Sequence, residues 1–387
     1  MRPQLRTPIE GPNRAVSANR VVCRDFQEAA PWGRFLASQK QAHVEQSLAW
    51  GRLKQAYGWD PVWVWLQRGT KILGGAMLLT RKAGGFAKIA YIERGPVWDL
   101  NEAGAADLVT QAVAETLAAL KVDYLAVAPP YYGGVTNGAL DTMRLRRKPE
   151  NLPPTGVGEA TLLIDLRQSI DELLADMSMT KRQNLRRAVR KGVRVRLGDE
   201  RDAETIRALV AASCRRRGLS LSPQQPDYFS NMWRLMAPAG LVKFFLAELE
   251  GEPLSAAVVH VFQRKMQLWR VGWSGTHIKH NPNDLLHWEA MKWAKEQGCE
   301  IFDFMHIRPD HARMLMKGER PRDSYAGVTE FKVSYGGQLL LLPDLLYGSF
   351  HPVVDVALAM GGARLMETRM GSHCIQALGR RIMKSCF

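Results

Sequence analysis

The sequence lacks long apolar runs and closely spaced cysteines. No stretch of about 18 uninterrupted apolar residues occurs, which is the length that a membrane-spanning helix needs, and residues 1–11 lack the apolar core of a secretory signal. The five cysteines are scattered, with neither CxxC metal spacing nor the density of a disulfide scaffold. We therefore expect a cytoplasmic protein with reduced thiols and no metal centre.

Phosphate-binding glycine motifs are also missing. There is no P-loop, no dinucleotide fingerprint and no zinc-type histidine spacing. Acyl-CoA enzymes bind pyrophosphate with an arginine- and glycine-containing turn at the start of a helix. Residues 81–86 come close to this motif but do not complete it, because they end in Phe86. His277, His280 and His287 straddle a turn and a helix start, so we interpret them as surface or capping residues. No cofactor is expected.

Acidic residues are few for so basic a chain. Against 53 Lys and Arg stand 38 Asp and Glu, giving a formal net charge of +15. Such an excess favours polyanionic partners, namely nucleic acid, anionic lipid head groups or a nucleotide-linked substrate. Between Lys181 and Arg196 there are eight basic residues and no acidic one. A solvated helical face usually mixes both signs, so we predict polyanion contact there, with a plain solvated helix as the alternative.

The 387 residues suit two domains, and one order of elements occurs twice. The first half reads as strands at 62–66, 72–80 and 88–92, after a helix at 41–57. A helix at 105–120 and a strand at 124–127 follow these strands. In the second half, strands at 241–249, 254–262 and 266–273 precede a helix at 285–297 and a strand at 301–304. We predict two copies of one α/β unit, in the α+β class, with a ligand groove between them.

A long basic helix is predicted between the copies. Ser169 caps it with Glu172 in the capping-box position, and Gly192 ends it after Lys191. The predicted domains are therefore residues 1–165 and 166–345, with the joining helix at 169–191. The tail at 346–387 is expected either to pack on the body or to lie on a membrane surface.

Lys332 is the residue best suited to chemistry. It lies between Phe331 and Val333, ahead of Tyr335 and the pair Gly336-Gly337. A lysine desolvated by such neighbours can act as a fixed positive charge toward an oxyanion. The alternative is an ordinary exposed lysine on a loop or strand edge.

Seven separated segments carry a family resemblance. They are residues 50–59, 74–76, 91–99, 180–193, 283–289, 302–304 and 331–337. In this order, over about residues 41–338, they resemble the Fem family of aminoacyl-tRNA-dependent peptidyltransferases, which add amino acids to peptidoglycan precursors. The resemblance implies two tandem GNAT-like acyltransferase domains. The coiled-coil arm of some members is missing, since Gly192 runs directly into Val193.

The resemblance also implies roles for individual residues. Lys332 would stabilise the transition state, while Asp99 and Asp303 would orient the acceptor amine or, alternatively, cap turns or form structural ion pairs. The acceptor would be held by Lys54, Arg217 (chosen from the run 215–217), Trp273 and Phe331. Contact with aminoacyl-tRNA would come from the basic helix, through Lys181, Arg182, Arg186, Arg187, Arg190 and Lys191.

The expected partners are thus aminoacyl-tRNA and a nucleotide- or lipid-linked peptidoglycan precursor, handled by a monomer near the inner face of the membrane. Two departures stand out, namely Met305-His306 where the family often has a glycine pair, and an unusually basic loop at 307–326. One alternative keeps the fold but serves exopolysaccharide or peptide-antibiotic synthesis, with an acyl-CoA or tRNA donor. The other is a non-catalytic protein that binds RNA or an anionic membrane.

Overall fold

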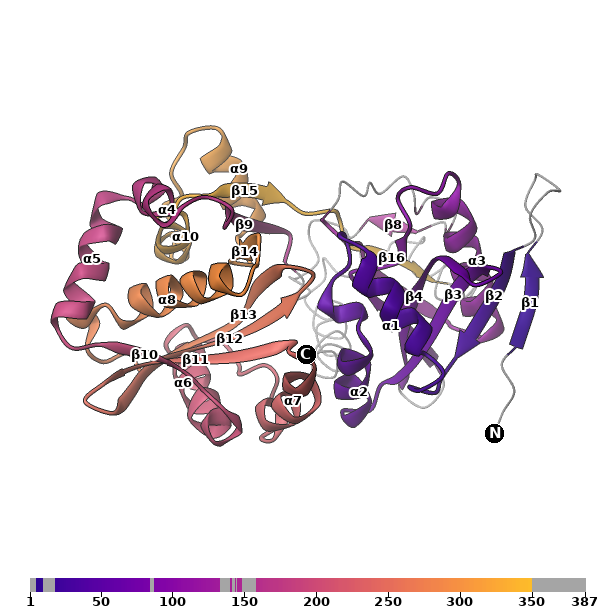
Figure 1. Cartoon of the computed structure of the whole chain (residues 1–387), viewed down its shortest axis with the longest axis horizontal. Coiled ribbons are helices and arrows are strands. Elements are labelled where there is room, and N and C mark those ends of the chain that lie inside the picture. The colour runs from indigo at the N-terminus through magenta and orange to yellow at the C-terminus, as the bar shows by residue number, and fades with distance from the viewer. Residues whose placement is uncertain are drawn as a thin grey trace, which may run out of the picture. The chain divides into compact units, whose positions relative to one another are not determined.

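The computed structural model describes residues 5–9, 18–83, 87–132, 140, 143, 145–147 and 158–349. The chain forms two compact units, one of Met1–Val157 with Pro343–Phe387 and one of Gly158–Leu342 (Figure 1). Most of the predicted tail, from residue 350 on, lies outside the described residues. Among the described helices, none has the length and apolarity needed to cross a membrane.

The first unit is a mixed sheet with helices. Its elements are β1 (Leu5–Ile9), β2 (Ala18–Cys23), α1 (Ala30–Ser38), η1 (Val44–Gln46), α2 (Leu48–Ala56), β3 (Asp60–Arg68), β4 (Lys71–Ala83), β5 (Ala87–Glu93), β6 (Val97–Trp98), α3 (Ala105–Ala119), β7 (Tyr124–Ala128), β8 (Arg146–Arg147) and β16 (Leu346–Ser349).

Its strands follow the order β1-β2-β3-β4-β5-β7-β16-β8, with β6 paired to β4. All pairs in that path are antiparallel except β5 with β7. Every residue from Pro61 to Leu66 of β3 is buried, which requires cover on both faces of the sheet. Helices α3, α2 and α1 all pack against the β3–β4 pair and provide that cover.

The second unit repeats this plan around another sheet. Its elements are β9 (Ala160–Asp165), α4 (Ile170–Asp176), α5 (Met179–Arg190), β10 (Arg194–Leu197), η3 (Glu200–Asp202), α6 (Ala203–Arg216), α7 (Tyr228–Met236), η4 (Ala237–Ala239), β11 (Val242–Leu249), β12 (Glu252–Phe262), β13 (Lys265–Trp273), η5 (Ile278–His280), α8 (Pro282–Glu296), β14 (Ile301–Asp303), α9 (Pro309–Met316), α10 (Ala326–Val333) and β15 (Gln338–Leu341).

Here the strand order is β10-β11-β12-β13-β14-β9-β15, and β13 with β14 is the parallel pair. Helix α8 packs on β11 and β12, and α6 packs on β12 and β13. Figure 1 shows these two helices above and below the sheet. Gly272 of β13 permits the approach of α6, because a Cβ there would lie 2.5 Å from the backbone nitrogen of Val210.

The two units share one order of elements, as the sequence predicted. An antiparallel meander, β3-β4-β5 or β11-β12-β13, leads into a helix, α3 or α8. The helix leads into a strand, β7 or β14, that pairs in parallel with the third meander strand. The helix supplies the crossover connection that a parallel pair requires.

Three sequence-based boundaries need correction. Residues 41–57 do not form one helix, since η1 precedes α2 and the side chain of Ser47 caps α2 at the backbone nitrogen of Trp50. The joining helix is two helices, because Met177 is extended and Ser178 caps α5, although the predicted capping box at Ser169 and Glu172 is present. Strand β9, placed in the first domain by a boundary at residue 165, pairs with β14 and β15 of the second unit.

Candidate active site

The turn that follows β14 is held in place by hydrogen bonds from Lys332. Its Nζ donates to the carbonyl oxygens of Phe304 at 3.1 Å, Met305 at 2.5 Å and His306 at 3.0 Å. Met305 and His306 both have positive φ, 47° and 45°, which is uncommon for residues other than glycine. Three charge-assisted hydrogen bonds therefore stabilise a strained turn, and backbone strain of this kind gathers at functional sites.

Lys332 itself lies in the last turn of α10, not on a strand or loop. Gly336 and Gly337 follow, with φ of 82° and 88°, and a Cβ on Gly337 would lie 2.5 Å from the carbonyl oxygen of Leu163. The glycine pair thus lets the chain turn tightly out of α10 against β9. This local geometry fixes the lysine at the end of strand β14.

Burial lowers the pKa of Lys332 to about 7. The carboxylate of Asp303 acts in the opposite direction, and the positive charge of Arg217 lowers the pKa further. No hydrogen bond or ion pair joins the Lys332 ammonium to a carboxylate in the described part of the chain. Its charge is therefore available to a developing anion, although its three hydrogens already have carbonyl partners.

Asp303 is completely buried and serves the same turn from the other side. Its Oδ1 accepts a hydrogen bond from the hydroxyl of Thr161 and another from the backbone nitrogen of Met305 at 2.8 Å. This arrangement favours the turn-capping interpretation of Asp303 over direct contact with an acceptor amine. Thr161, on β9, was not singled out from the sequence, because its partner lies 142 positions away.

A second lysine lies beneath α10. Lys181 is 3% exposed, donates to Asp284 Oδ1 at 2.8 Å, and sits 3.7 Å and 4.1 Å from the ring centroids of Phe331 and Tyr335. Burial lowers its pKa, and the carboxylate of Asp284 opposes that effect. The predicted contact of Lys181 with tRNA is therefore wrong, because the side chain is enclosed. Phe331, predicted to bind the acceptor, is half-buried and packs against His287 and Tyr335 of this cluster.

Two further buried groups complete the cluster. Tyr335 donates its hydroxyl hydrogen to the carbonyl oxygen of Asp284 at 2.9 Å, and its burial raises the pKa of that hydroxyl. His287 contacts the rings of Phe304, Phe331 and Tyr335. Its burial lowers the imidazole pKa to about 3, so the ring is neutral at pH 7. The prediction that His287 is a surface or capping residue is therefore wrong. Asp284, the counter-ion of Lys181, was not singled out from the sequence.

The arginines at the end of α6 meet Trp273 of β13. Arg216 stacks on the Trp273 ring at 4.7 Å and donates to its carbonyl oxygen at 2.6 Å. Arg217, favoured from the sequence, is exposed and caps the end of α6, while its charge acts on Lys332. Trp273 is half-buried. The second unit thus brings Lys332, Asp303 and Arg217 into one electrostatic neighbourhood.

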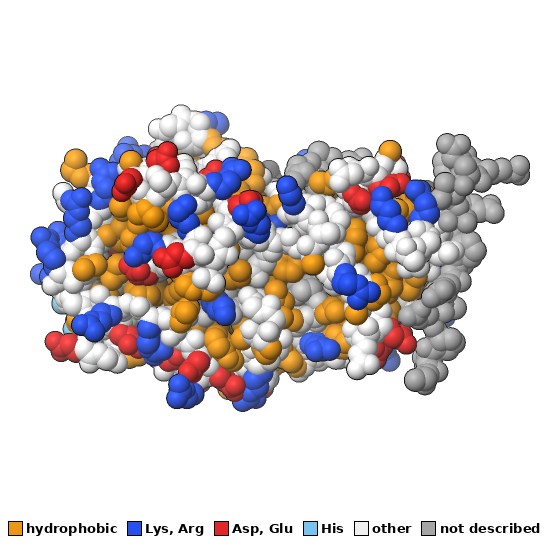
Figure 2. Space-filling model, viewed as in Figure 1, with side chains coloured by type: hydrophobic (Ala, Val, Ile, Leu, Met, Phe, Trp, Pro, Cys, Tyr) orange, Lys and Arg blue, Asp and Glu red, His pale blue; other side chains and the backbone are white. Residues whose placement is uncertain are grey.

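Helix α5 divides its basic residues between two tasks. Arg182 donates to the carbonyl oxygens of Leu174, Ala175 and Met177, which fixes the end of α4 and occupies a side chain predicted to bind tRNA. The remaining four are exposed, and in Figure 2 lysine and arginine side chains line the edge of the unit where α5 lies. We call these four the α5 ridge: Arg186, Arg187, Arg190 and Lys191.

In the first unit, the predicted acceptor residues have carboxylate or turn partners. Lys54 is 5% exposed, lies 3.8 Å from Glu93 and packs 4.7 Å from the centroid of Trp50. Asp99 accepts from the backbone nitrogen of Asn101 at 3.0 Å and pairs with Lys71 at 3.5 Å. Asp99 therefore caps a turn, the alternative role considered for it.

Two family models match separate parts of the chain. The FemAB family model matches residues 28–136, and a model of a GNAT acetyltransferase domain matches residues 179–313. The FemAB match lies in the first unit and the GNAT match in the second. No curated protein sequence matches the chain.

Solved structures with the same fold extend over both units. The crystal structure of FemX matches with a TM-score of 0.73 at 18% identity, covering 86% of this chain and 98% of that one. The C-terminal domain of a putative lysylphosphatidylglycerol synthetase from Agrobacterium fabrum matches at 0.52 and 17% identity, covering 88% and 97%. A protein of unknown function from Bacteroides thetaiotaomicron matches at 0.51 and 10% identity, covering 84% and 97%. These matches show the fold.

The predicted fold class is confirmed. The chain has two tandem GNAT-type units, and α5 ends at Arg190, so the described residues contain no coiled-coil arm between the units. The FemAB and GNAT matches, together with this fold, support a transferase of the acyltransferase type.

Proposed function

We propose that the chain transfers an amino acid from aminoacyl-tRNA to an amine of a peptidoglycan-precursor stem peptide. The observation that carries the proposal is the turn at residues 304–306, which we call the Lys332 turn. Lys332, with a pKa of about 7, donates to the three carbonyl oxygens of this strained turn and contacts no carboxylate among the described residues. Such a fixed charge suits a reaction in which negative charge develops on a carbonyl oxygen.

The reaction needs no oxidant or metal. The acceptor amine attacks the carbonyl carbon of the aminoacyl ester, and a C–N bond forms. The tetrahedral oxyanion then collapses, the ester C–O bond breaks, and the ribose oxygen leaves with the proton that the amine loses. Because the ester is already activated, the protein contributes positioning and stabilisation of charge. A preorganised cation is worth about 3–4 kcal/mol in such a transition state.

The α5 ridge supports an RNA donor. Its four exposed basic side chains, three on α5 and one at the residue after it, can neutralise phosphates without reading bases. Binding to the backbone of a charged tRNA requires contacts of this kind. The groups predicted to hold the acceptor, Lys54 in the first unit and Arg217 in the second, stay predictions.

Transfer of radiolabel from a mixed pool of charged tRNAs to a panel of nucleotide- and lipid-linked cell-wall precursors tests the proposal. Label entering a precursor, and falling by about 10²–10³ in Lys332→Ala, is the expected result. Parallel reactions contain acyl-CoA in place of tRNA, and exopolysaccharide or peptide amines in place of precursors. Consumption of acyl-CoA with no tRNA-dependent transfer would overturn the donor assignment and leave an N-acyltransferase.

A further inference from the structure

The segment from α9 to α10, residues 309–333, begins and ends at the Lys332 turn. Helix α9 starts at Pro309, three residues after His306, and α10 carries Lys332 in its last turn. Since the Lys332 ammonium contacts the carbonyls of residues 304–306, both ends of the segment are fixed at the same point. The segment therefore leaves the Lys332 turn through α9 and returns to it through α10, with residues 317–325 between the two helices.

A buried histidine and an arginine hold the segment together. His311, which is 1% exposed, contacts Thr329 Oγ1 through Nδ1 at 2.7 Å and Asp323 Oδ2 through Nε2 at 3.0 Å. Arg308 pairs with Asp310 at 2.5 Å and with Asp323 at 3.1 Å. The two aspartates of the segment are therefore neutralised within it, and the loop between the helices is tied to both.

The exposed side chains of the segment are basic and partly apolar. Among residues 311–325, the exposed basic side chains are Arg313, Lys317, Arg320 and Arg322, none of which has a carboxylate partner in the described part of the chain. Glu319 is the only acidic side chain there outside the Arg308 and His311 network. Met316 is 50% exposed and Tyr325 36%, and Arg308 lies over the Tyr325 ring at 5.5 Å.

We infer that the α9–α10 segment binds the unpaired 3′ end of the donor RNA beside Lys332. Single-stranded nucleic acid is bound by basic side chains that follow the phosphates and by aromatic faces on which bases stack. Tyr325, fixed from one side by Arg308, offers such a face. The inference rests on the proposed function, because only an RNA donor carries its reactive ester on a terminal nucleotide.

Helix α10 connects this surface to the α5 ridge. On one side Lys181 of α5 contacts Phe331, and on the other His311 of α9 contacts Thr329. A donor whose paired stem contacts the ridge could therefore place its single-stranded end over α9 and α10. The ridge then contacts phosphates of the stem, and the segment contacts both phosphates and a base of the single-stranded end.

Filter binding with two RNAs tests the inference, one an intact uncharged tRNA and the other the same tRNA shortened by its three terminal nucleotides. The intact tRNA is expected to bind at least about fivefold more tightly, since one stacked base is worth that much. In Lys317→Ser/Arg320→Ser/Arg322→Ser the preference disappears. The slope of log affinity against log salt for the intact tRNA also falls by about 2, since each single-strand phosphate contact contributes about 0.7.

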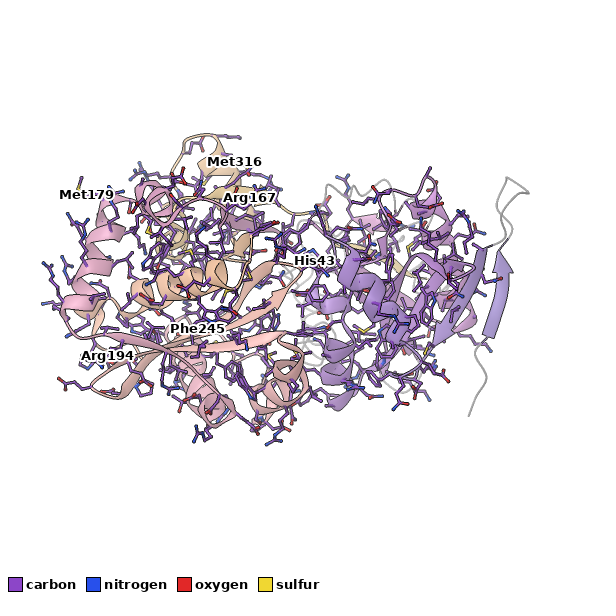
Figure 3. The ribbon with its side chains drawn as sticks, viewed as in Figure 1. His43, Arg167, Met179, Arg194, Phe245 and Met316 are labelled. Carbon is purple, nitrogen blue, oxygen red and sulfur yellow. The ribbon has the colours of Figure 1, made fainter. Side chains whose placement is uncertain are left out.

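Two pairs of variants separate the base contact from general charge. Tyr325→Ala is expected to lose the preference and Tyr325→Phe to keep it, because the ring and not the hydroxyl stacks. Arg194→Ser serves as the matched control, as an exposed arginine on β10 that lies well away from Met316 within the same unit (Figure 3). It should retain the full preference for the intact end. Circular dichroism confirms that each variant is folded.

Equal affinity for both RNAs, or a preference that survives the triple substitution, would overturn the inference. So would a triple variant that binds tRNA normally but loses binding to phosphatidylglycerol–phosphatidylcholine vesicles, which would make the surface a membrane contact. The transfer assay tests the proposed function independently of the binding assay. Transfer without an end preference would support the proposed function and overturn this inference. An end preference without transfer would support binding of the RNA end and overturn the proposed function.

Discussion

One lysine lies within α10 and another packs against it, and the two are held in opposite ways. Lys181 has a carboxylate partner, Asp284, together with two aromatic faces, and it is enclosed. Lys332 contacts only carbonyl oxygens and is half-buried, with a pKa lowered to about 7. The carboxylate of Asp284 neutralises the charge of Lys181, so this lysine stabilises the fold. The charge of Lys332 has no carboxylate in contact with it within the described part of the chain and can act on a substrate, and we assign the chemistry to Lys332 on that ground.

Removing the partner of Lys181 should have the largest effect on stability. Asp284→Ala leaves a buried lysine without a counter-ion, and we expect the free energy of unfolding to fall by about 3–5 kcal/mol. The double variant Lys181→Met/Asp284→Leu removes both charges and should lie within about 1–2 kcal/mol of the natural chain. Urea unfolding measures both. Similar losses in the two variants would mean that Lys181 is not held as a charged pair.

Lys332 should behave differently, with a larger effect on rate than on stability. Lys332→Met is expected to slow transfer by about 10²–10³, because a charge near the oxyanion is lost. The free energy of unfolding should also fall, by about 1–3 kcal/mol, because the carbonyl oxygens of the turn lose their donor. Because the natural lysine is charged only below its pKa of about 7, the rate through Lys332 falls as pH rises past 7.

An arginine at this position sharpens the assignment. Arginine stays charged throughout the neutral range, so the residual activity of Lys332→Arg should not decline between pH 7 and 9. The measured quantity is the ratio of natural to variant rates, which should fall by about tenfold per pH unit above 7. A ratio that is flat with pH would mean that the charge of Lys332 plays no part in the reaction.

His287 lies in the field of both lysines and should make the fold sensitive to acid. Its pKa is about 3 in the folded chain and near 6.5 when unfolded, so the unfolded state binds more protons between those values. Stability is therefore fully present above pH 6.5 and falls as pH decreases through this window. From pH 7 to 5 the loss should be about 2 kcal/mol. His287→Gln, which cannot titrate, should lack this component in urea unfolding at the two pH values.

The order of elements could be predicted from the sequence because alternation and helical periodicity record burial directly. Helix α10 could not, since Gly327, Val328, Thr329 and Val333 are poor helix formers and the helix depends on the His311–Thr329 contact and on packing around Tyr335. The burial of Lys181 did leave a signal. It shares a helical face with Leu185 and Ala188, which are both buried, so its spacing set it apart from the ridge.

The partner of Lys181 left no such signal in the sequence. Asp284 lies 103 positions further along the chain, and nothing in the local pattern joins the two residues. The same holds for Thr161 and Asp303, so the predicted catalytic aspartate could not be distinguished from a turn cap by sequence alone. Pairings between distant elements are set by the sheet and helix packing, which the sequence indicates only as an order.

The smallest expected effect separates the exposed from the buried part of α5. Arg190→Ser removes one member of the α5 ridge, so the slope of log tRNA affinity against log salt should fall by about 0.9, with a loss of a few-fold in affinity at moderate salt. Lys181→Met removes a charge from the same helix but one that solvent does not reach, and the slope should stay unchanged. If both substitutions lowered the slope equally, the net charge of the helix would govern binding; a change with Arg190 alone requires that each phosphate contact be made by an exposed side chain.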